Sequence, residues 1–99
     1  MKIKINEKLK DIDGVKPLVN PNNKTVTLKD VCTTALLSPV EGDDERKKFE
    51  KWEIFKKVRD AKDVVELTAE QIALIKSGIG KIYPPLILGQ AFELLENNK

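Results

Sequence analysis

The spacing of apolar residues changes once along the chain, and this change limits the folds open to it. Residues 2–5 alternate lysine with isoleucine, which is the period-two pattern of a strand with one buried face. From Leu28 onward apolar residues recur every three or four positions, which is typical of helices that bury one side. The sequence therefore predicts an α+β fold that is mostly α, with its strands near the N-terminus.

Turn signals organise residues 1–27 into a short β-hairpin. Asp13-Gly14 favours a type I′ turn, which needs positive φ values. Residues 20–23 (Asn-Pro-Asn-Asn) form a second turn before a β-prone stretch at 25–27. Pro17 limits the returning strand to an edge position or a short length. Such a hairpin is not stable alone, so it must pack against other elements.

Helix boundary signals predict three to four packed helices in residues 28–96. Thr27 with Asp30 approximates a capping box, and Thr68 with Gln71 forms a complete one. Prolines mark the ends of helices and the start of the last one. The expected helices run from Leu28 to Ser38-Pro39, from Asp44 to Ala61, from Thr68 to Ile82 and from Pro85 to Glu96.

The chain length predicts one domain over residues 1–99. Its parts are the extended region 1–27, the helical region 28–96 and a frayed tail at 97–99, with 63–67 as a linker or a short added strand. Every apolar stretch in the sequence is far too short to cross a membrane. The first residues lack the apolar region of a signal peptide.

Composition removes most catalytic chemistry. The chain has no histidine and one cysteine, Cys32, which excludes Ser-His-Asp and Cys-His catalysis, histidine-containing zinc sites and an intrachain disulfide. The 18 Lys+Arg and 16 Asp+Glu give a formal charge of +2, too balanced to indicate a polyanion partner. We therefore expect no enzyme activity, no catalytic residues, no cofactor and no bound metal.

Three local patterns resemble known sites but are incomplete. Asp11-x-Asp13-Gly14 lacks the remaining ligands of a calcium loop, so a turn explains it. Residues 77–81 lack the first glycine and the final Ser or Thr of a phosphate loop, which favours close helix packing instead. The adjacent carboxylates at 43–45 are expected to be solvated and to favour the N-terminus of the following helix.

The predicted helix from Asp44 to Ala61 carries most of the aromatic mass. We expect Phe49, Trp52 and Phe55 to be structural core residues, so that Trp52→Ala costs about 3–5 kcal/mol. The alternative is that Trp52 is an exposed aromatic residue that binds a partner, in which case the variant would melt like wild type but lose that partner. Cys32 shares an apolar helical stripe and is expected to be a buried structural thiol. The interleaved basic and aromatic residues at 46–52 leave nucleic-acid binding as an alternative, although the bases spread around the helix.

The apolar residues of the last predicted helix cover more than one face. This surplus favours an interaction surface, either with a second copy or with a target. The alternative is that Gly78, Gly80 and Gly89 let the last two helices pack closely and bury the whole arc. The predicted partner-binding residues are Leu86, Leu88, Phe92 and Leu95.

Several segments together indicate a family. They are Asp13-Gly14, Thr27–Leu37, the charged aromatic helix, Leu67–Lys76 and Tyr83–Glu96. In this combination the chain resembles small uncharacterised proteins of tailed bacteriophages and prophages. The resemblance implies a phage-encoded protein that acts in the host bacterial cytoplasm, and it carries over no catalytic residues.

These observations favour an interaction protein over an enzyme. The expected function is a protein-interaction factor that acts in particle assembly or inhibits a host or defence protein. The alternative is a small nucleic-acid-binding regulator, which a salt titration would reveal because phosphate contacts weaken steeply with salt.

Overall fold

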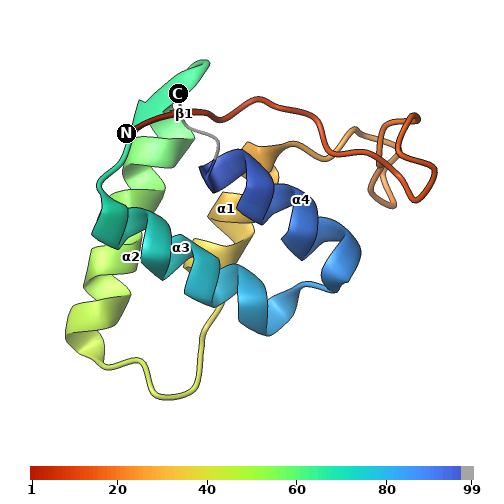
Figure 1. Ribbon diagram of the computed structural model, residues 1–99. Coiled ribbons are helices and arrows are strands. Elements are labelled where there is room, and N and C mark those ends of the chain that lie inside the picture. The colour runs from red at the N-terminus through yellow and green to blue at the C-terminus, as the bar shows by residue number, and fades with distance from the viewer. Residues whose placement is uncertain (97–99) are drawn as a thin grey trace.

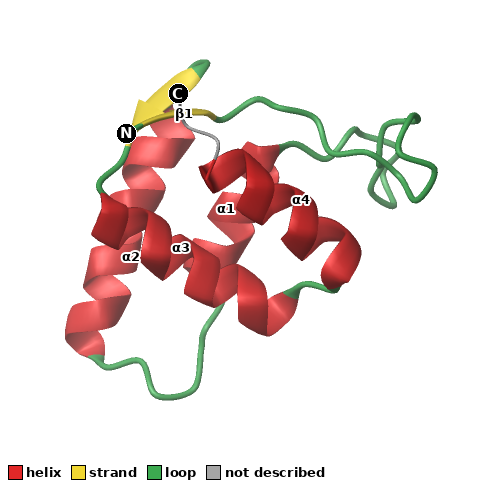
Figure 2. Ribbon diagram, viewed as in Figure 1, coloured by secondary structure: helices red, strands yellow, loops and turns green. Residues whose placement is uncertain are grey.

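The computed structural model describes residues 1–96 and confirms a mostly α, α+β fold. Four helices and a small sheet make up these residues (Figures 1 and 2). The elements are β1 (Lys2–Lys4), α1 (Leu28–Leu37), α2 (Glu45–Asp60), β2 (Val64–Glu66), α3 (Ala69–Ile82) and α4 (Pro85–Glu96). The predicted frayed tail, residues 97–99, lies outside the described residues.

The sheet pairs a strand near the N-terminus with a strand from the segment between α2 and α3. β1 pairs antiparallel with β2, and Ile3 lies opposite Val65 with both side chains buried. The partner of β1 therefore comes from residues 64–66, not from residues 1–27 as the hairpin prediction required. Of the two readings left open for residues 63–67, the short added strand is correct. The local turn signals could not reveal a partner that lies 60 residues away.

Residues 5–27 form an irregular loop held by isolated bridges rather than by a regular ladder. Leu18 N donates to Leu9 O at 3.0 Å, and Asp11 N donates to Lys16 O at 2.7 Å. The turn between them is not type I′, because Gly14 has a positive φ of 74° and Asp13 does not. Asp13 Oδ1 instead accepts from the amides of Val15 and Lys16, and these bonds lower the pKa of Asp13.

The helix starts follow the capping signals. Thr27 Oγ1 accepts from Asp30 N at 3.3 Å, while Asp30 Oδ2 accepts from Thr27 N at 3.0 Å. Asp30 thus completes a capping box although glutamate or glutamine is the usual residue. Thr68 and Gln71 form the second box as predicted.

The core surrounds α1, which packs against α2, α3 and α4. The fully or almost fully buried apolar residues are Ile3, Ile5, Leu9, Leu28, Val31, Cys32, Ala35, Leu36, Ile54, Val58, Val65, Leu67, Ile72, Ile75, Ile79, Ala91 and Leu95. Cys32 is buried as predicted, and burial raises the pKa of its thiol to about 12. Among residues 1–96, no helix has the length and apolarity needed to cross a membrane.

Gly78 explains how closely α3 approaches α1. A Cβ atom at this position would lie 3.1 Å from Ala35 O, so glycine lets the two backbones come together. Gly80 and Gly89 would place a Cβ atom in open space. The small residues therefore do not bring α3 and α4 together, and the close contact involves α1 instead.

Candidate functional site

The largest departure from the predicted core lies on α2. Phe49 is 62 % exposed and Trp52 is 43 % exposed, while Phe55 is partly buried. The prediction that Phe49 and Trp52 are core residues is therefore wrong, and Phe55 packs only against the edge of the core. We call Phe49, Trp52 and Phe55 the aromatic ridge.

The helical spacing of α2 explains why the aromatic ridge faces outward. The residues that α2 buries are Lys51, Ile54 and Val58, which share one face. At 100° per residue, Phe55 falls beside that face, Trp52 lies about 100° from its nearest edge and Phe49 falls nearly opposite it. The sequence contains this pattern, because Ile54 and Val58 form a stripe of their own, but the larger aromatic residues obscured it.

The aromatic ridge is internally ordered. The rings of Trp52 and Phe55 stack with centroids 5.4 Å apart and an interplanar angle of 27°. The Arg59 guanidinium, one helical turn after Phe55, lies 5.5 Å from the Phe55 ring centroid. Arg59 also donates to Asp60, so this cation is paired with a carboxylate. These contacts hold large apolar surfaces in place at the exterior.

A groove lies on each side of the aromatic ridge. The groove toward α1 has a volume of about 390 Å³ and is lined by Leu36, Leu37, Ser38, Pro39, Asp43, Lys48, Lys51 and Trp52. The groove toward α3 has a volume of about 400 Å³ and is lined by Phe49, Glu50, Glu53, Ile54, Glu70, Gln71 and Leu74. We call the second one the α2–α3 groove.

A buried ion pair fixes the loop that borders the first groove. Lys51 Nζ donates to Asp43 Oδ2, and both side chains are almost completely buried. The hydrogen bond from Lys51 lowers the pKa of Asp43 below its ordinary value. Because Asp43 lies in the loop after α1 and Lys51 in α2, the pair ties the loop to the helix.

The other acidic candidates also have structural roles. Asp44 caps α2 by accepting from Lys47 N at 2.8 Å. Asp11 Oδ1 accepts from the Ile12 amide within its own turn. Across residues 1–96, no three metal-ligating side chains are grouped closely enough to hold a metal ion. The phosphate-loop pattern at 77–81 lies inside α3, as its helical spacing indicated.

The predicted interaction residues on α4 are buried to different extents. Leu95 is 0 % exposed and belongs to the core, so its prediction as a partner-binding residue is wrong. Leu88 and Phe92 pack against the core with part of their surface left, and Lys76 Nζ lies 5.3 Å from the Phe92 ring centroid. Leu86 is 38 % exposed. The wide apolar arc therefore packs against the core but keeps part of its surface exposed, and Gly80 and Gly89 do not provide the close helix contact that the alternative required.

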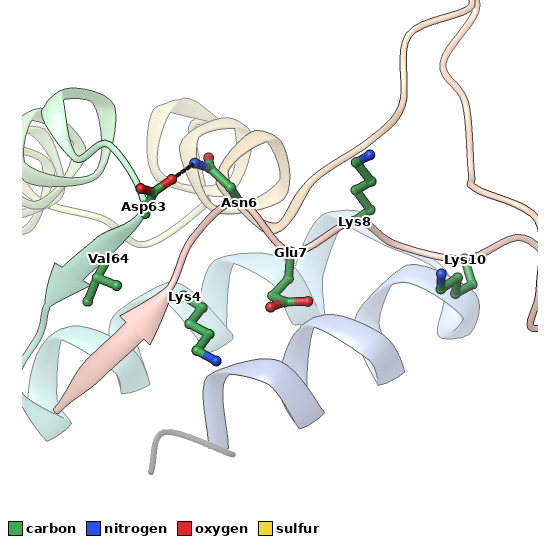
Figure 3. A pocket seen from close by; sticks show the side chains of 7 residues that line it. All are labelled: Lys4, Asn6, Glu7, Lys8, Lys10, Asp63 and Val64. Atoms are coloured by element: carbon green, nitrogen blue, oxygen red, sulfur yellow. Dashed lines mark hydrogen bonds between the residues drawn. The ribbon is translucent and has the colours of Figure 1, made fainter.

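A larger hollow lies along the N-terminal strand and is rich in lysine. It has a volume of about 500 Å³ and is lined by Lys4, Asn6, Glu7, Lys8, Lys10, Asp63 and Val64. Figure 3 shows that Lys8 and Glu7 extend to opposite sides of the segment that follows β1, while Asn6 turns toward Asp63. Since its cations do not converge and two carboxylates offset them, the hollow is a weak candidate for an anion site.

Gln90 explains how the segment that follows β1 is held in place. Its side-chain amide accepts from Lys10 N at 2.7 Å and donates to Lys10 O at 2.8 Å, so α4 fixes the backbone of the extended segment. Gln90 therefore has a structural role that was not predicted from the sequence. The sign of this role in the sequence was a polar residue within an apolar helix.

Comparison with protein-family models, with curated proteins and with solved structures finds no match to this chain. The functional argument therefore rests on the surface itself.

Proposed function

We propose that this protein is a non-enzymatic protein-binding factor whose partner contacts the aromatic ridge. The observation that carries the proposal is the exposure of Phe49 and Trp52 on an ordered helix. Large exposed aromatic residues cost solubility unless a partner covers them, and tryptophan is enriched among the residues that dominate binding energy. The grooves on both sides give a partner places to insert its own side chains.

The resemblance to small proteins of tailed phages suggests where the partner is found. A phage-encoded factor of this kind binds either a structural protein during particle assembly or a host or defence protein that it inhibits. Both classes of partner are present in an infected bacterial cell, so one purification experiment addresses both. A second copy of the chain is a further partner that the same surface could bind.

Nucleic-acid binding is the second candidate, and one observation favours it. The stacked pair of Trp52 and Phe55, with Arg59 over Phe55, resembles the stacking platforms that bind unpaired bases. The charges on α2 argue against it, because four of its basic residues pair with carboxylates. These pairs are Arg46 with Glu50, Lys51 with Asp43, Lys56 with Glu53, and Arg59 with Asp60.

Affinity purification from infected cells tests the proposal. The tagged protein, its Trp52→Ala variant and its Leu86→Ala variant are compared by mass spectrometry, with nucleic acid removed by nuclease. We expect a protein that is recovered with wild type and Leu86→Ala but lost with Trp52→Ala. Equal recovery with all three would place the contact elsewhere. Oligonucleotide binding that weakens steeply with salt would favour the alternative.

Light scattering after size exclusion determines whether the partner is a second copy. A mass that doubles with concentration for wild type, but not for Trp52→Ala, would identify the aromatic ridge as a self-association surface. A constant monomer mass for both proteins directs the search to other partners.

A further inference from the structure

We infer that the α2–α3 groove binds a basic amphipathic helical segment of the partner protein, with an apolar side chain seated beside Phe49. This inference rests on the proposed protein-binding function and specifies the chemistry of the partner. Three features of the groove support it: the groove lies between two helices that pack mainly against α1, its floor is apolar, and its rim carries carboxylates.

The groove exists because α2 and α3 both pack against α1 rather than mainly against each other. Between them remain Ile54, which is almost buried, and Leu74, which is partly buried, with Phe49 exposed at one border. Among the described residues, one side-chain hydrogen bond links α2 to α3: Lys57 Nζ donates to Gln71 Oε1 at 3.4 Å. An apolar groove between two helices is the surface on which amphipathic helices commonly dock.

The charged residues that line this groove are all acidic. Glu50 and Glu53 come from α2 and Glu70 comes from the first turn of α3. Glu50 pairs loosely with Arg46 at 3.7 Å and Glu53 pairs with Lys56 at 3.1 Å, and both pairs are solvent-exposed. Within residues 1–96, Glu70 has no cation within 4 Å.

These charges select among the occupants. Lysine or arginine side chains at the edges of a docked helix would face carboxylates on both walls, which favours their encounter and orientation. A nucleic-acid strand would bring phosphates against the same three carboxylates and would be repelled. An acidic peptide would meet the same repulsion. A basic segment with a large apolar residue satisfies both the floor and the rim of the groove.

Selection from a displayed library of random helical peptides tests the inference without knowledge of the partner. The bait is the full chain at moderate ionic strength, and the enriched peptides are synthesised and titrated against variants by fluorescence anisotropy. We expect enriched sequences that place Lys or Arg beside a large apolar residue three or four positions away. Enrichment of acidic sequences, or no enrichment above an unrelated bait, would overturn the inference.

Two matched triple variants separate the groove from the net charge of the protein. One carries Glu50→Gln, Glu53→Gln and Glu70→Gln, and the other carries Glu7→Gln, Glu41→Gln and Glu93→Gln. Both raise the formal charge equally, and the control residues lie outside the groove. The groove triple should weaken binding by about tenfold, since exposed ion pairs contribute modestly and add up. Equal weakening by both triples would show a net-charge effect only.

Two single variants distinguish failure of this inference from failure of the proposed function. Phe49→Ala should weaken peptide binding by about tenfold or more, as loss of an aromatic anchor does. If the peptides depend on Trp52 but not on Phe49, the aromatic ridge binds protein and the α2–α3 groove does not. If neither variant changes binding, the peptides bind elsewhere and both proposals lose their support.

Discussion

Helices α2 and α4 both carry large apolar side chains, but they bury them to different extents. α4 has two charged residues in its twelve; it buries Ala91 and Leu95 and packs most of its other apolar residues against the core with part of their surface exposed. α2 has eleven charged residues in its sixteen and leaves two of its three aromatic rings in solvent. The amount of apolar surface on a helix therefore does not determine how much of it is buried.

The neighbours of each helix explain the difference. α4 contacts α1, α3 and β1, so three elements cover different parts of its surface. α2 rests principally on α1, which covers one narrow face. A helix with one neighbour buries a single stripe and exposes the rest, whatever residues the rest contains. The exposed rings of α2 are thus surface that no element within residues 1–96 covers.

The largest effect on this comparison is expected from shortening a buried side chain near the end of α4. Leu95→Ala should lower the free energy of unfolding by about 2–5 kcal/mol, because it removes buried methyl groups and leaves a cavity. Leu86→Ala, on the exposed side of the same helix, should cost less than about 1 kcal/mol. Urea denaturation measures both. Similar costs for the two variants would show that α4 is not seated as described.

The close contact between α1 and α3 can be tested by substituting glycines of α3. Gly78→Ala introduces a Cβ atom 3.1 Å from Ala35 O, whereas Gly80→Ala introduces one into open space on the same helix. Gly80→Ala should stabilise the protein by up to about 1 kcal/mol through helix propensity. Gly78→Ala should lie about 1–3 kcal/mol below it, because overpacking strains the α1–α3 contact. Thermal unfolding of both variants gives the comparison, and equal stabilities would contradict the close approach.

Cys32 reports on α1, the helix on which both α2 and α4 rest. Burial raises the pKa of this thiol to about 12, so the folded state keeps its proton where the unfolded state releases it. Stability should therefore be unaffected well below pH 9 and should fall as pH rises from about 9 toward 12. By pH 10 the loss should reach about 1–2 kcal/mol. Chemical denaturation of wild type and Cys32→Val across this range isolates the thiol, and parallel curves would show that Cys32 is accessible.

Local signals in the sequence predicted the helices accurately. The caps at Thr27, Asp44 and Thr68 and the proline before α4 act within a few residues, so their positions alone define where helices begin. The buried stripe containing Cys32 was also predictable, because apolar spacing on α1 is unambiguous. The mostly α, α+β fold follows from these local rules.

What depended on distant neighbours could not be predicted. The pairing of β1 with β2 joins segments separated by most of the chain, and no turn signal encodes it. Trp52 was predicted to lie in the core and Leu95 on a binding surface because the prediction relied on residue type. Burial depends instead on which elements lie alongside each residue. The aromatic ridge was recoverable only from the spacing of Ile54 and Val58, which marks the buried face of α2.

A substitution at Trp52 tests the exposed aromatic surface of α2. Trp52→Ala should cost about 1 kcal/mol, since nearly half of the side chain is already in solvent and its stack with Phe55 contributes modestly. Chemical denaturation followed by circular dichroism suits this variant, because the chain has one tryptophan and the substitution removes its fluorescence. A cost of several kcal/mol would return Trp52 to the core and leave the ridge without its main interface residue.

The smallest effect is expected at Phe49, and it makes the sharpest use of the contrast between the helices. Phe49→Ala should change the free energy of unfolding by less than about 0.5 kcal/mol, because the ring is the most exposed of the aromatic ridge and alanine favours the helix. A ring that contributes so little to folding but lies beside an acidic groove is available for a partner. Denaturation curves that overlay those of wild type, together with weakened peptide binding, would separate the binding role of α2 from its packing role. A substantial loss of stability would instead mean that Phe49 closes the α2–α3 groove within the monomer.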